Sequence, residues 1–489
     1  MGEQKKTTQS GTGTENMVGP FVHKMKQAGM PQAVIDLFAE YAGQFINSQS
    51  VGFIPESTIQ PIREDEVKGQ DHLSPEDEQV GISALDQAVA IKLNGGLGTS
   101  MGMPYAKSLL QVRSEMTFLD IICKQAGIGD SGHSSTPGLV LMNSFNTHAD
   151  TLEYLDRLKL SAREGPWSFM QHTYPKILAD SLRPAHCPEQ PDLEWNPPGH
   201  GDVYAALYTS GMLEKLLKAG KRYALVSNAD NLGAVLNPSI LGYVIRNDLQ
   251  FLMEVAQRSP ADKKGGHLAK RPDGRLVLRE IAQCPDQDVQ AFQDIDRHSF
   301  FNTNSIWLDL QALQTMITNQ GLPRLPLIVN PKNLDPRDEN SPQVYQLETA
   351  MGAAISSFDR SGALHVDRRR FAPVKKTNEL LVVRSDCYLL SDTYQLVPNP
   401  QRSAPPIEVD LDPEYFKKVD QFESRFPQGE PSLLDCVRLI VKGDVLFEAD
   451  VICRDEVVLR NETQMQQRVE QGTLLSGEKV WSEPMPISR

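Results

Sequence analysis

The sequence predicts an α/β fold, with a mostly parallel, mixed β-sheet layered by helices and a β-helix at its C-terminal end. Two patterns lead to this prediction. Between about residues 86 and 385, short apolar runs alternate with amphipathic segments of helical period. After them the apolar residues recur every six positions, a spacing typical of hexapeptide β-helices. A chain of 489 residues is too long for one core, so we expect several domains.

The alternating part begins with the apolar run AVAIKL, residues 88–93, which we expect to be a strand. GLVLMNS (138–144) and RYALVSN (222–228) are predicted strands of the same sheet. Thr117 precedes the stretch FLDIICKQ as a typical helix N-cap, and residues 202–220 are predicted to form one long helix. Ligands bind at the carboxyl ends of parallel strands, so the loops after 88–93 and 222–228 are the first candidates for function.

The six-residue repeat covers residues 439–460 in four rows. One position of the repeat is apolar in every row, occupied by Leu439, Val445, Val451 and Val457. We therefore predict that residues 386–489 form a left-handed β-helix domain. A pair of hairpins with coincidental spacing is the alternative. The exposed stacking edges of a β-helix suit self-association, so we expect a homo-oligomer formed through this domain.

Residues 1–85 are predicted to be an N-terminal helical arm that begins with a disordered tail. The first 17 residues are polar and lack the apolar centre of a signal peptide. Residues 18–45 have the spacing of an amphipathic helix, and the charged, proline-containing stretch 55–79 is expected to be a linker or surface loop. The predicted domains are thus 1–85, 86–385 and 386–489.

Composition excludes several classes of protein. The net charge of −14 disfavours a nucleic-acid-binding surface. The six cysteines are scattered without a C-x-x-C pair, which disfavours a disulfide framework and a structural zinc site. No apolar run approaches the length of a membrane helix. We therefore expect a cytoplasmic protein whose partners include neither nucleic acid nor membrane.

A glycine-rich loop, LNGGLGTSMG, follows the first predicted strand at residues 93–102. It fails the dinucleotide-binding motif because Met101 stands where the third glycine is needed, and it fails the P-loop motif because Ala106 precedes Lys107. Glycines still allow close backbone approach to a ligand, and successive N–H groups can form a cradle for phosphate. A ligand-free tight turn is the alternative.

KLNGGLGTSMG followed by AKSLL resembles the activation loop of the UDP-glucose pyrophosphorylase (UTP–glucose-1-phosphate uridylyltransferase) family. Further blocks resemble family blocks in the family order: NPPGHGDVYAAL, LVSNADNLGA, FFNTNSIWLDL, IVNPKNLD, QLETAMGAAI and FAPVKKTNELLVVRSD. The resemblance spans about residues 88–386. It implies a Rossmann-like nucleotidyltransferase domain that transfers a uridylyl group from UTP to glucose 1-phosphate, giving UDP-glucose and pyrophosphate with Mg²⁺.

That reaction joins two anions and needs no general base, because the attacking phosphate oxygen is already ionised. The site needs cations, backbone N–H groups and a carboxylate for Mg²⁺. The resemblance implies that Lys107 and Lys375 are the catalytic lysines and that Asp230 contacts the nucleotide and the metal. Without the glycine loop before it, Lys107 would be read as a surface lysine at the start of a strand. Asp230 is equally a helix N-cap or an Asx turn.

The resemblance also assigns the remaining contacts. Gln171 corresponds to the glutamine that reads the uracil edge, and His200 to the histidine that contacts the α-phosphate. The implied nucleotide contacts are Leu93, Gly95, Gly96, Gln171, Gly199, His200 and Asp230. The implied sugar contacts are Asn228, Glu280, Asn302 and Asn304. On local sequence alone, these polar residues are also compatible with structural or surface positions.

The sequence departs from the family pattern just before Lys107. Pro104, Tyr105 and Ala106 stand where eukaryotic members tend to carry lysine, glycine and proline, so the resemblance does not extend to an extra positive charge near the triphosphate or to the loop's flexibility. Leu97 and the Ser100–Met101 pair disfavour N-acetylglucosamine relatives. Galactose 1-phosphate, a broader UDP-sugar pyrophosphorylase and a non-catalytic nucleotide-sugar sensor stay open as alternatives.

Overall fold

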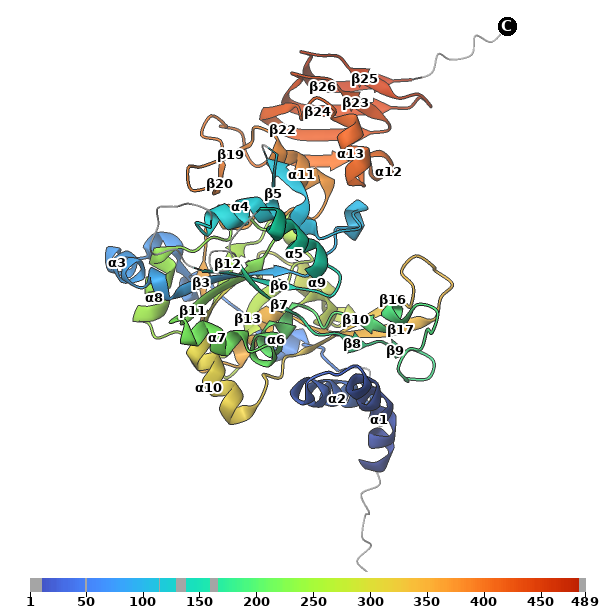
Figure 1. The fold of residues 1–489 in the computed structure, drawn as a ribbon. Helices are drawn as coiled ribbons and strands as arrows, with labels where there is room; N and C mark the ends of the chain where they lie inside the picture. Colours follow the sequence, from blue (N-terminus) through green and yellow to red (C-terminus); the bar gives the residue numbers. More distant parts are fainter. Residues whose placement is uncertain (1–10, 49–50, 114, 129–137, 159–165, 483–489) are drawn as a thin grey trace, which may run out of the picture.

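The computed structural model describes residues 11–48, 51–113, 115–128, 138–158 and 166–482. Within this part of the chain, an eleven-stranded sheet forms the centre of the molecule (Figure 1). Its main path runs in the order β2 (Lys68–Gly69), β18 (Ser361–His365), β12 (Phe251–Gln257), β15 (Phe300–Asp309), β11 (Tyr223–Asn228), β3 (Ala88–Asn94), β6 (Gly138–Asn143) and β7 (Trp167–Met170). Off this path lie β1 (Gln60–Pro61), β13 (His267–Lys270) and β14 (Leu276–Arg279).

The sheet is mixed and mostly parallel, as predicted. Strands β11, β3, β6 and β7 are parallel neighbours, whereas β15 is antiparallel to β11 and β12. From β3 the chain continues to β6 and β7 on one side, and later returns to β11 on the other. The carboxyl ends of β3 and β11 therefore flank a point where the strand order reverses, which is where open α/β sheets bind ligands.

Helices cover both faces of this sheet. Val89 and Ile91 of β3 pack into the apolar core on one face, and Ala90 packs into a second core on the other. The helices of the central part are α3 (Pro75–Ser83), α4 (Phe118–Gln125), α5 (His148–Arg157), α6 (Val203–Thr209), α7 (Met212–Lys218), α8 (Pro238–Arg246), α9 (Val289–Gln293), α10 (Leu310–Gln320) and α11 (Thr377–Arg384).

The helix boundaries confirm one prediction and correct another. The Thr117 hydroxyl accepts a hydrogen bond from the Asp120 N–H at 3.1 Å, so Thr117 caps α4 as predicted. The single helix predicted over 202–220 is wrong. Gly211 has φ +75°, a left-handed conformation that a continuous helix excludes, and the segment forms α6 and α7 instead.

Smaller sheets flank the central one. Strand β17 (Gln343–Thr349) pairs with β16 (Leu327–Asn333) and β9 (Ile177–Leu178), and β8 (Tyr174–Pro175) pairs with β10 (Trp195–Asn196). A short hairpin joins β4 (Gln111–Arg113) to β5 (Met116–Thr117).

The N-terminal part contains two helices, α1 (Gly11–Gln27) and α2 (Gln32–Asn47), where one was predicted. Gly29, with φ +70°, and Pro31 separate them. Residues 11–17, predicted to be disordered, belong to α1, and the rest of that tail lies outside the described residues. The stretch 55–79, predicted to be a linker or loop, also supplies β1, β2 and the start of α3.

In the C-terminal part, four strands stack in parallel: β21 (Glu408–Leu411), β22 (Ser432–Lys442), β24 (Ile452–Asn461) and β26 (Leu474–Trp481). The remaining elements are β19 (Tyr388–Leu390), β20 (Leu396–Pro398), α12 (Pro413–Phe416), α13 (Val419–Arg425), β23 (Val445–Phe447) and β25 (Gln467–Val469). Figure 1 shows this stack at one end of the molecule and α1 and α2 at the other.

The six-residue repeat agrees with the observed strand register. Leu439 lies opposite Val457, three rows of six further along the chain, and both are fully buried. Val445 and Val451, from the intervening rows, are buried as well. Ile452, one position later in the repeat, is 38% exposed, so neighbouring columns face opposite sides of the strands.

Candidate active site

A cavity of about 310 Å³ opens at the carboxyl ends of β3 and β11. Leu93 pairs with Asn228 across these parallel strands, and the Ala229 N–H donates to the Leu93 carbonyl at 3.1 Å. Nine residues that the sequence analysis predicted for the site line this cavity: Leu93, Gly95, Gly96, Lys107, Gln171, Gly199, His200, Asn228 and Asp230. Strand pairing explains the meeting of segments more than a hundred residues apart.

The glycine loop leaves the edge of this cavity and returns to it, and its two ends are hydrogen-bonded to each other. The Lys107 N–H donates to the Gly96 carbonyl at 3.1 Å, and Leu97 forms a β-bridge with Ala106. Nearer the tip, the Met103 N–H donates to the Gly98 carbonyl at 3.1 Å. The loop is thus a narrow hairpin whose base, not its tip, faces the cavity.

Lys107 and Asp230 form an ion pair in the cavity wall. The Lys107 ammonium donates to Asp230 Oδ2 at 2.6 Å, and the two side chains are 16% and 19% exposed. The other carboxylate oxygen, Oδ1, is buried without a hydrogen-bond partner. Asp230 is not a helix N-cap, since the cap of α8 is Asn237. Its free oxygen is available to a ligand.

The donors here fit a hard divalent cation with few protein ligands. The described residues contain no cluster of three or more histidine, cysteine or acidic side chains that could enclose a metal. Asp230 is the carboxylate that lines the cavity. Mg²⁺ is commonly held by one or two carboxylates, with phosphates and water completing its shell. Asp230 has one unpaired carboxylate oxygen and lies beside the base of the glycine loop, an arrangement that suits this ion.

His200 is held as a neutral hydrogen-bond donor. Burial lowers its pKa to about 4, so the ring is uncharged at pH 7. Its Nδ1 accepts a hydrogen bond from the Met351 N–H at 3.0 Å, which places the ring proton on Nε2. Gly199 precedes it with φ +78°, and a Cβ there would lie 2.5 Å from the Thr349 carbonyl oxygen. Only glycine fits this approach.

Gln171 lies over the start of the glycine loop. A Cβ on Gly95 would lie 3.0 Å from Gln171 Nε2, so a side chain at position 95 would displace the amide. The neighbouring His172 is fixed by Asp202, whose carboxylate accepts from the His172 N–H at 2.7 Å and lies 2.9 Å from His172 Nδ1. His172 and Asp202 were not predicted from the sequence, although both lie beside predicted site residues in the QH and GHGD segments.

The other predicted sugar contacts form a second group of residues, namely Glu280, Asn302 and Asn304. Asn302 Nδ2 donates to Asn304 Oδ1 at 2.9 Å, where β15 shifts register against β12. Asn304 has φ +55°, an uncommon conformation outside glycine that marks this β-bulge. A Cβ on Gly266 would lie 2.5 Å from the Glu280 carboxylate, and the Gly266 carbonyl accepts from the Asn302 N–H at 2.9 Å.

The segment that carries Lys375 contacts the cavity wall through its backbone. The preceding Val374 N–H donates to the Asp230 carbonyl at 3.2 Å. In the second group, burial raises the pKa of Glu280 to about 7 while the charge of Lys375 opposes that rise. Lys375 itself is exposed and does not line the cavity, so the structure relates it to the cavity through the neighbouring backbone and to the second group through its charge.

Buried hydrogen bonds hold the segment that carries Lys375 in place. Arg370 is 6% exposed and donates through Nε to Glu254 at 2.8 Å, while the Trp307 indole donates to the same carboxylate at 2.8 Å. Asn231 Nδ2 donates to the Arg370 carbonyl at 3.0 Å. Arg370 is thus structural, because its charge is paired with the Glu254 carboxylate inside the protein.

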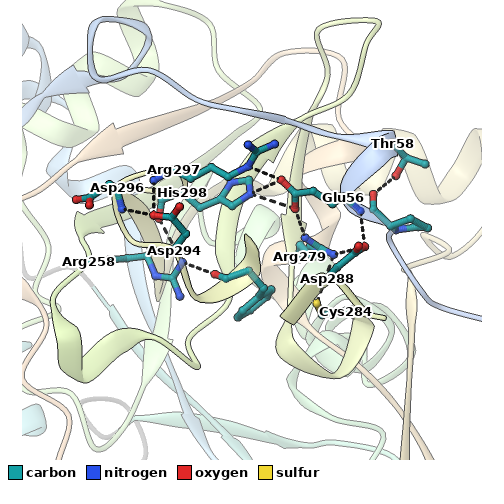
Figure 2. A network of polar contacts seen from close by, with 12 residues as sticks. Glu56, Thr58, Arg258, Arg279, Cys284, Asp288, Asp294, Asp296, Arg297 and His298 are labelled. Carbon is teal, nitrogen blue, oxygen red and sulfur yellow. Dashed lines mark hydrogen bonds and ion pairs between the residues drawn. The ribbon is translucent and has the colours of Figure 1, made fainter. Parts of the chain in front are cut away.

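A network of polar contacts includes Arg279, the residue that precedes Glu280 (Figure 2). Arg279, fully buried, donates to Glu56 at 2.6 Å and lies 3.1 Å from Asp288. Glu56 also pairs with Arg297 at 2.7 Å and with His298 at 3.0 Å. Burial alone would raise the pKa of Glu56, but these hydrogen bonds lower it below its usual value. A residue of the N-terminal segment thereby fixes the residue preceding Glu280.

No helix among the described residues is long and apolar enough to cross a membrane.

Comparison with known proteins identifies the family of this chain. Residues 35–454 match the UTP–glucose-1-phosphate uridylyltransferase family. The chain is 38% identical to that enzyme from Solanum tuberosum over 91% of both chains. A Trypanosoma brucei structure, named UDP-glucose phosphorylase, shares 41% identity over 96% of this chain and all of its own, with a TM-score of 0.86. A Leishmania major UDP-glucose pyrophosphorylase variant, solved with UDP-glucose, shares 40% identity over 97% of this chain and all of its own, with a TM-score of 0.88. With this match over most of its length, the chain belongs to the UTP–glucose-1-phosphate uridylyltransferase family.

Proposed function

We propose that this protein transfers the uridylyl group of UTP to glucose 1-phosphate, giving UDP-glucose and pyrophosphate in a reversible reaction. Its family membership supports this activity. The structural observation that carries the proposal is one cavity that joins the base of the glycine loop, the Gln171 amide and the Lys107–Asp230 pair. These groups match a pyrimidine nucleotide whose phosphates meet backbone N–H groups and a cation.

In the proposed reaction, a phosphate oxygen of glucose 1-phosphate attacks the α-phosphorus of UTP in line with the leaving pyrophosphate. One P–O bond forms, the bond to the β-phosphate bridge breaks, and no proton moves. We assign to Lys375, whose charge acts on Glu280 and whose neighbour Val374 contacts Asp230, the stabilisation of the charge on both phosphates. His200 donates from Nε2 to the α-phosphate, and Lys107 holds the triphosphate.

We assign Asp230 as the protein ligand of a Mg²⁺ ion. Its unpartnered Oδ1 supports this assignment. When bound, the ion would screen the negative charges of the reacting phosphates. The Lys107 ammonium, which contacts Oδ2 at 2.6 Å, would keep the carboxylate oriented.

We assign Asn228, Glu280, Asn302 and Asn304 to the hexose. Asn228 lines the nucleotide cavity, whereas Glu280, Asn302 and Asn304 form a separate group, which supports two ends of one substrate-binding site. Glucose and galactose 1-phosphates differ by one axial hydroxyl, so a broader UDP-sugar pyrophosphorylase is the second candidate. A non-catalytic sensor is disfavoured because Lys375 and Asp230 are both in place.

We further propose that the central nucleotidyltransferase domain covers residues 86–385, with a helical arm before it, and that residues 386–489 form a left-handed β-helix through which the protein self-associates. Parallel stacking of β22, β24 and β26 supports the β-helix. The six free cysteine thiols support our proposal that the protein acts in the cytoplasm.

A pyrophosphate-release assay tests the activity. The full chain is incubated with UTP, Mg²⁺ and glucose, galactose or N-acetylglucosamine 1-phosphate, and kcat/KM is compared. We expect glucose 1-phosphate to be preferred by at least about tenfold, the discrimination that one or two substrate hydrogen bonds supply. Equal rates with galactose 1-phosphate would favour the broader enzyme. No release with any sugar phosphate, together with retained UDP-glucose binding, would favour the sensor.

A further inference from the structure

One buried carboxylate joins the two segments that carry Gln171 and His200. Asp202 ends the 3₁₀ turn His200–Asp202, and its side chain is 1% exposed. Asp202 Oδ2 accepts a hydrogen bond from the His172 N–H at 2.7 Å, and Oδ1 lies 2.9 Å from His172 Nδ1. Gln171 and His200 line the nucleotide cavity, whereas His172 and Asp202 do not. The Asp202–His172 pair is thus placed to support lining residues rather than to touch a ligand.

The Asp202 carboxylate is not used by the helix that it precedes. Asp202 occupies the N-cap position of α6, yet its side chain makes no cap hydrogen bond there. An aspartate at this position ordinarily accepts from the N–H groups of the first helical turn. Here the carboxylate bonds to His172 instead, and a bond from a backbone N–H to a carboxylate is charge-assisted and therefore strong. The contact with His172 sets the direction of this side chain.

The His172 ring is held at both of its nitrogens. Nδ1 contacts Asp202, and Nε2 lies 2.9 Å from the Thr209 hydroxyl of α6. That hydroxyl is itself fixed, because it donates to the Ala205 carbonyl at 2.9 Å. The ring therefore has one orientation, between the turn that contains His200 and the helix that follows it.

These contacts fix the backbone on both sides of Gln171. The Gln171 N–H donates to the Asn143 carbonyl at 2.8 Å, and the next N–H along the chain, that of His172, donates to Asp202. The Gln171 amide lies against Gly95, where a Cβ would be 3.0 Å from its Nε2. The place of the amide in the cavity therefore depends on a backbone that β6 holds on one side and Asp202 on the other.

We propose that Asp202 and His172 are positioning residues that set the selectivity of the site for uracil over cytosine. This inference rests on the proposed uridylyl transfer and on the assignment of Gln171 to the uracil edge. Uracil presents an N–H and a carbonyl where cytosine presents an acceptor nitrogen and an amino group. A glutamine amide has both a donor and an acceptor, so it discriminates between these bases only when it is held in one place. The Asp202–His172 pair supplies that constraint.

Competition between UTP and CTP on the full chain tests the proposal. Both nucleotides are supplied at equal concentration with glucose 1-phosphate and Mg²⁺, and the initial formation of UDP-glucose and CDP-glucose is measured. The product ratio equals the ratio of the two kcat/KM values, and it does not depend on how much of the enzyme is folded. The two nucleotides share ribose and triphosphate, so changes in phosphate binding cancel in this ratio.

Three variants separate the parts of the contact. Asp202→Ala removes both acceptors and should lower the preference for UTP by about tenfold, the contribution of one well-placed hydrogen bond. Asp202→Asn keeps an acceptor for the His172 N–H and should stay within about threefold of the wild-type preference. His172→Phe keeps the N–H, fills the space of the ring and removes both ring contacts. It should lower the preference by at least about threefold.

Asp309→Ala is the matched control. Asp309 is 5% exposed and accepts from the Gln311 and Ala312 N–H groups at 2.8 and 3.0 Å. It lies opposite Tyr223, at the end of β11 away from the cavity. This variant also loses a buried carboxylate that holds backbone N–H groups, so it should lose stability and total activity but keep the wild-type preference for UTP.

An unchanged product ratio in Asp202→Ala would overturn the proposal. If Asp202→Ala does not fold, an unchanged ratio in His172→Phe would overturn it. An equal change in Asp309→Ala would also do so, because general loosening of the fold would then explain the result, and so would a wild type without preference for UTP. A wild-type chain that forms neither product would show that the proposed transfer itself is wrong, and the present inference falls with it. That result differs from an active wild type whose variants keep its preference.

Discussion

Glu280 shows how burial adjusts a single side chain to substrate binding. A pKa of about 7 leaves this carboxyl mostly protonated at pH 6 and mostly ionised at pH 8. The folded protein holds the proton more tightly than the unfolded chain does. Stability from this group therefore falls as pH rises from about 4.5, the unfolded value, through the folded pKa. Near neutral pH, the protonation of Glu280 instead changes how it can bind a hydroxyl.

We expect UDP-glucose affinity to rise about threefold to tenfold between pH 6 and pH 8, because an ionised carboxylate accepts stronger hydrogen bonds from sugar hydroxyls. UDP-glucose is the suitable ligand because its diphosphate does not titrate in this range. Glu280→Gln, which is neutral at every pH, should abolish the dependence. The dissociation constant is measured by calorimetry across the range. The same pH dependence in Glu280→Gln would show that another group is responsible.

Lys375 should act on the transition state. Lys375→Ala is expected to lower kcat by about 10²-fold to 10³-fold, the loss typical of removing one charge-stabilising donor. UTP affinity should change less than about threefold, because the ground-state nucleotide retains Lys107. Steady-state kinetics and UTP titration are measured on one preparation. Lys376→Ala is the control, since Lys376 is an exposed lysine immediately beside it. Near-normal turnover in Lys375→Ala would remove this residue from the reaction.

Among the structural elements, a short N-terminal turn has an effect far beyond its length. Glu56 begins a single 3₁₀ turn, Glu56–Thr58, yet it neutralises Arg279, which is fully buried beside Glu280. Leaving a buried guanidinium partly unpaired is costly. The N-terminal segment therefore helps to place the sugar-side carboxyl, in addition to covering one side of the sheet.

Glu56→Gln should lower the free energy of unfolding by about 3 kcal/mol at pH 7. Because the pKa of Glu56 is lowered in the folded protein, its stabilisation is present above the unfolded value near 4.5 and is lost as pH falls through the folded pKa. Glu56→Gln should thus lose less stability on acidification than the wild type does. Urea unfolding at pH 7 and pH 4 measures both effects.

Asp65→Asn provides the control for this variant, because Asp65 pairs with Arg63 on the surface and both side chains are about 70% exposed. Such surface pairs contribute less than about 1 kcal/mol. Equal stability losses in the two variants would contradict a special role for Glu56.

At the scale of the whole molecule, the C-terminal strands and the central sheet share one apolar cluster. Phe118 and Leu119 of α4 belong to the same cluster as Leu439 and Val457 of the C-terminal strands. Gln125 spans the same boundary, because its Nε2 donates to the Tyr394 carbonyl at 2.9 Å. Removing the C-terminal part would expose a large apolar surface on the part that carries the site.

A chain that ends after residue 385 should therefore lose its cooperative unfolding transition or aggregate, and should have no transferase activity. Circular dichroism melting, sedimentation and the pyrophosphate-release assay measure these properties. A chain that ends after residue 482 is the control, because it retains every strand of the C-terminal stack. A soluble, active fragment of residues 1–385 would show that the shared cluster is dispensable.

Local sequence patterns determined the elements and the order of the blocks. The run at residues 88–93, the Thr117 cap and the six-residue columns each follow from a rule that acts within a few residues, and each is found in the structure. The alternating pattern also predicted the sheet class, which placed the glycine loop and Asp230 at strand ends. Breaks inside helical patterns, such as the one at Gly211, were missed because glycine is tolerated in many helices.

Only the tertiary structure decided which distant groups meet. Lys107 contacts Asp230 because β3 and β11 are parallel neighbours. Burial in the folded chain raises the pKa of Glu280 to about 7. Strand order, burial and long-range packing set these contacts, and none of them has a local signal. The sequence by itself thus determined the elements and their chemistry, whereas the folded chain determined their distances, charges and partners.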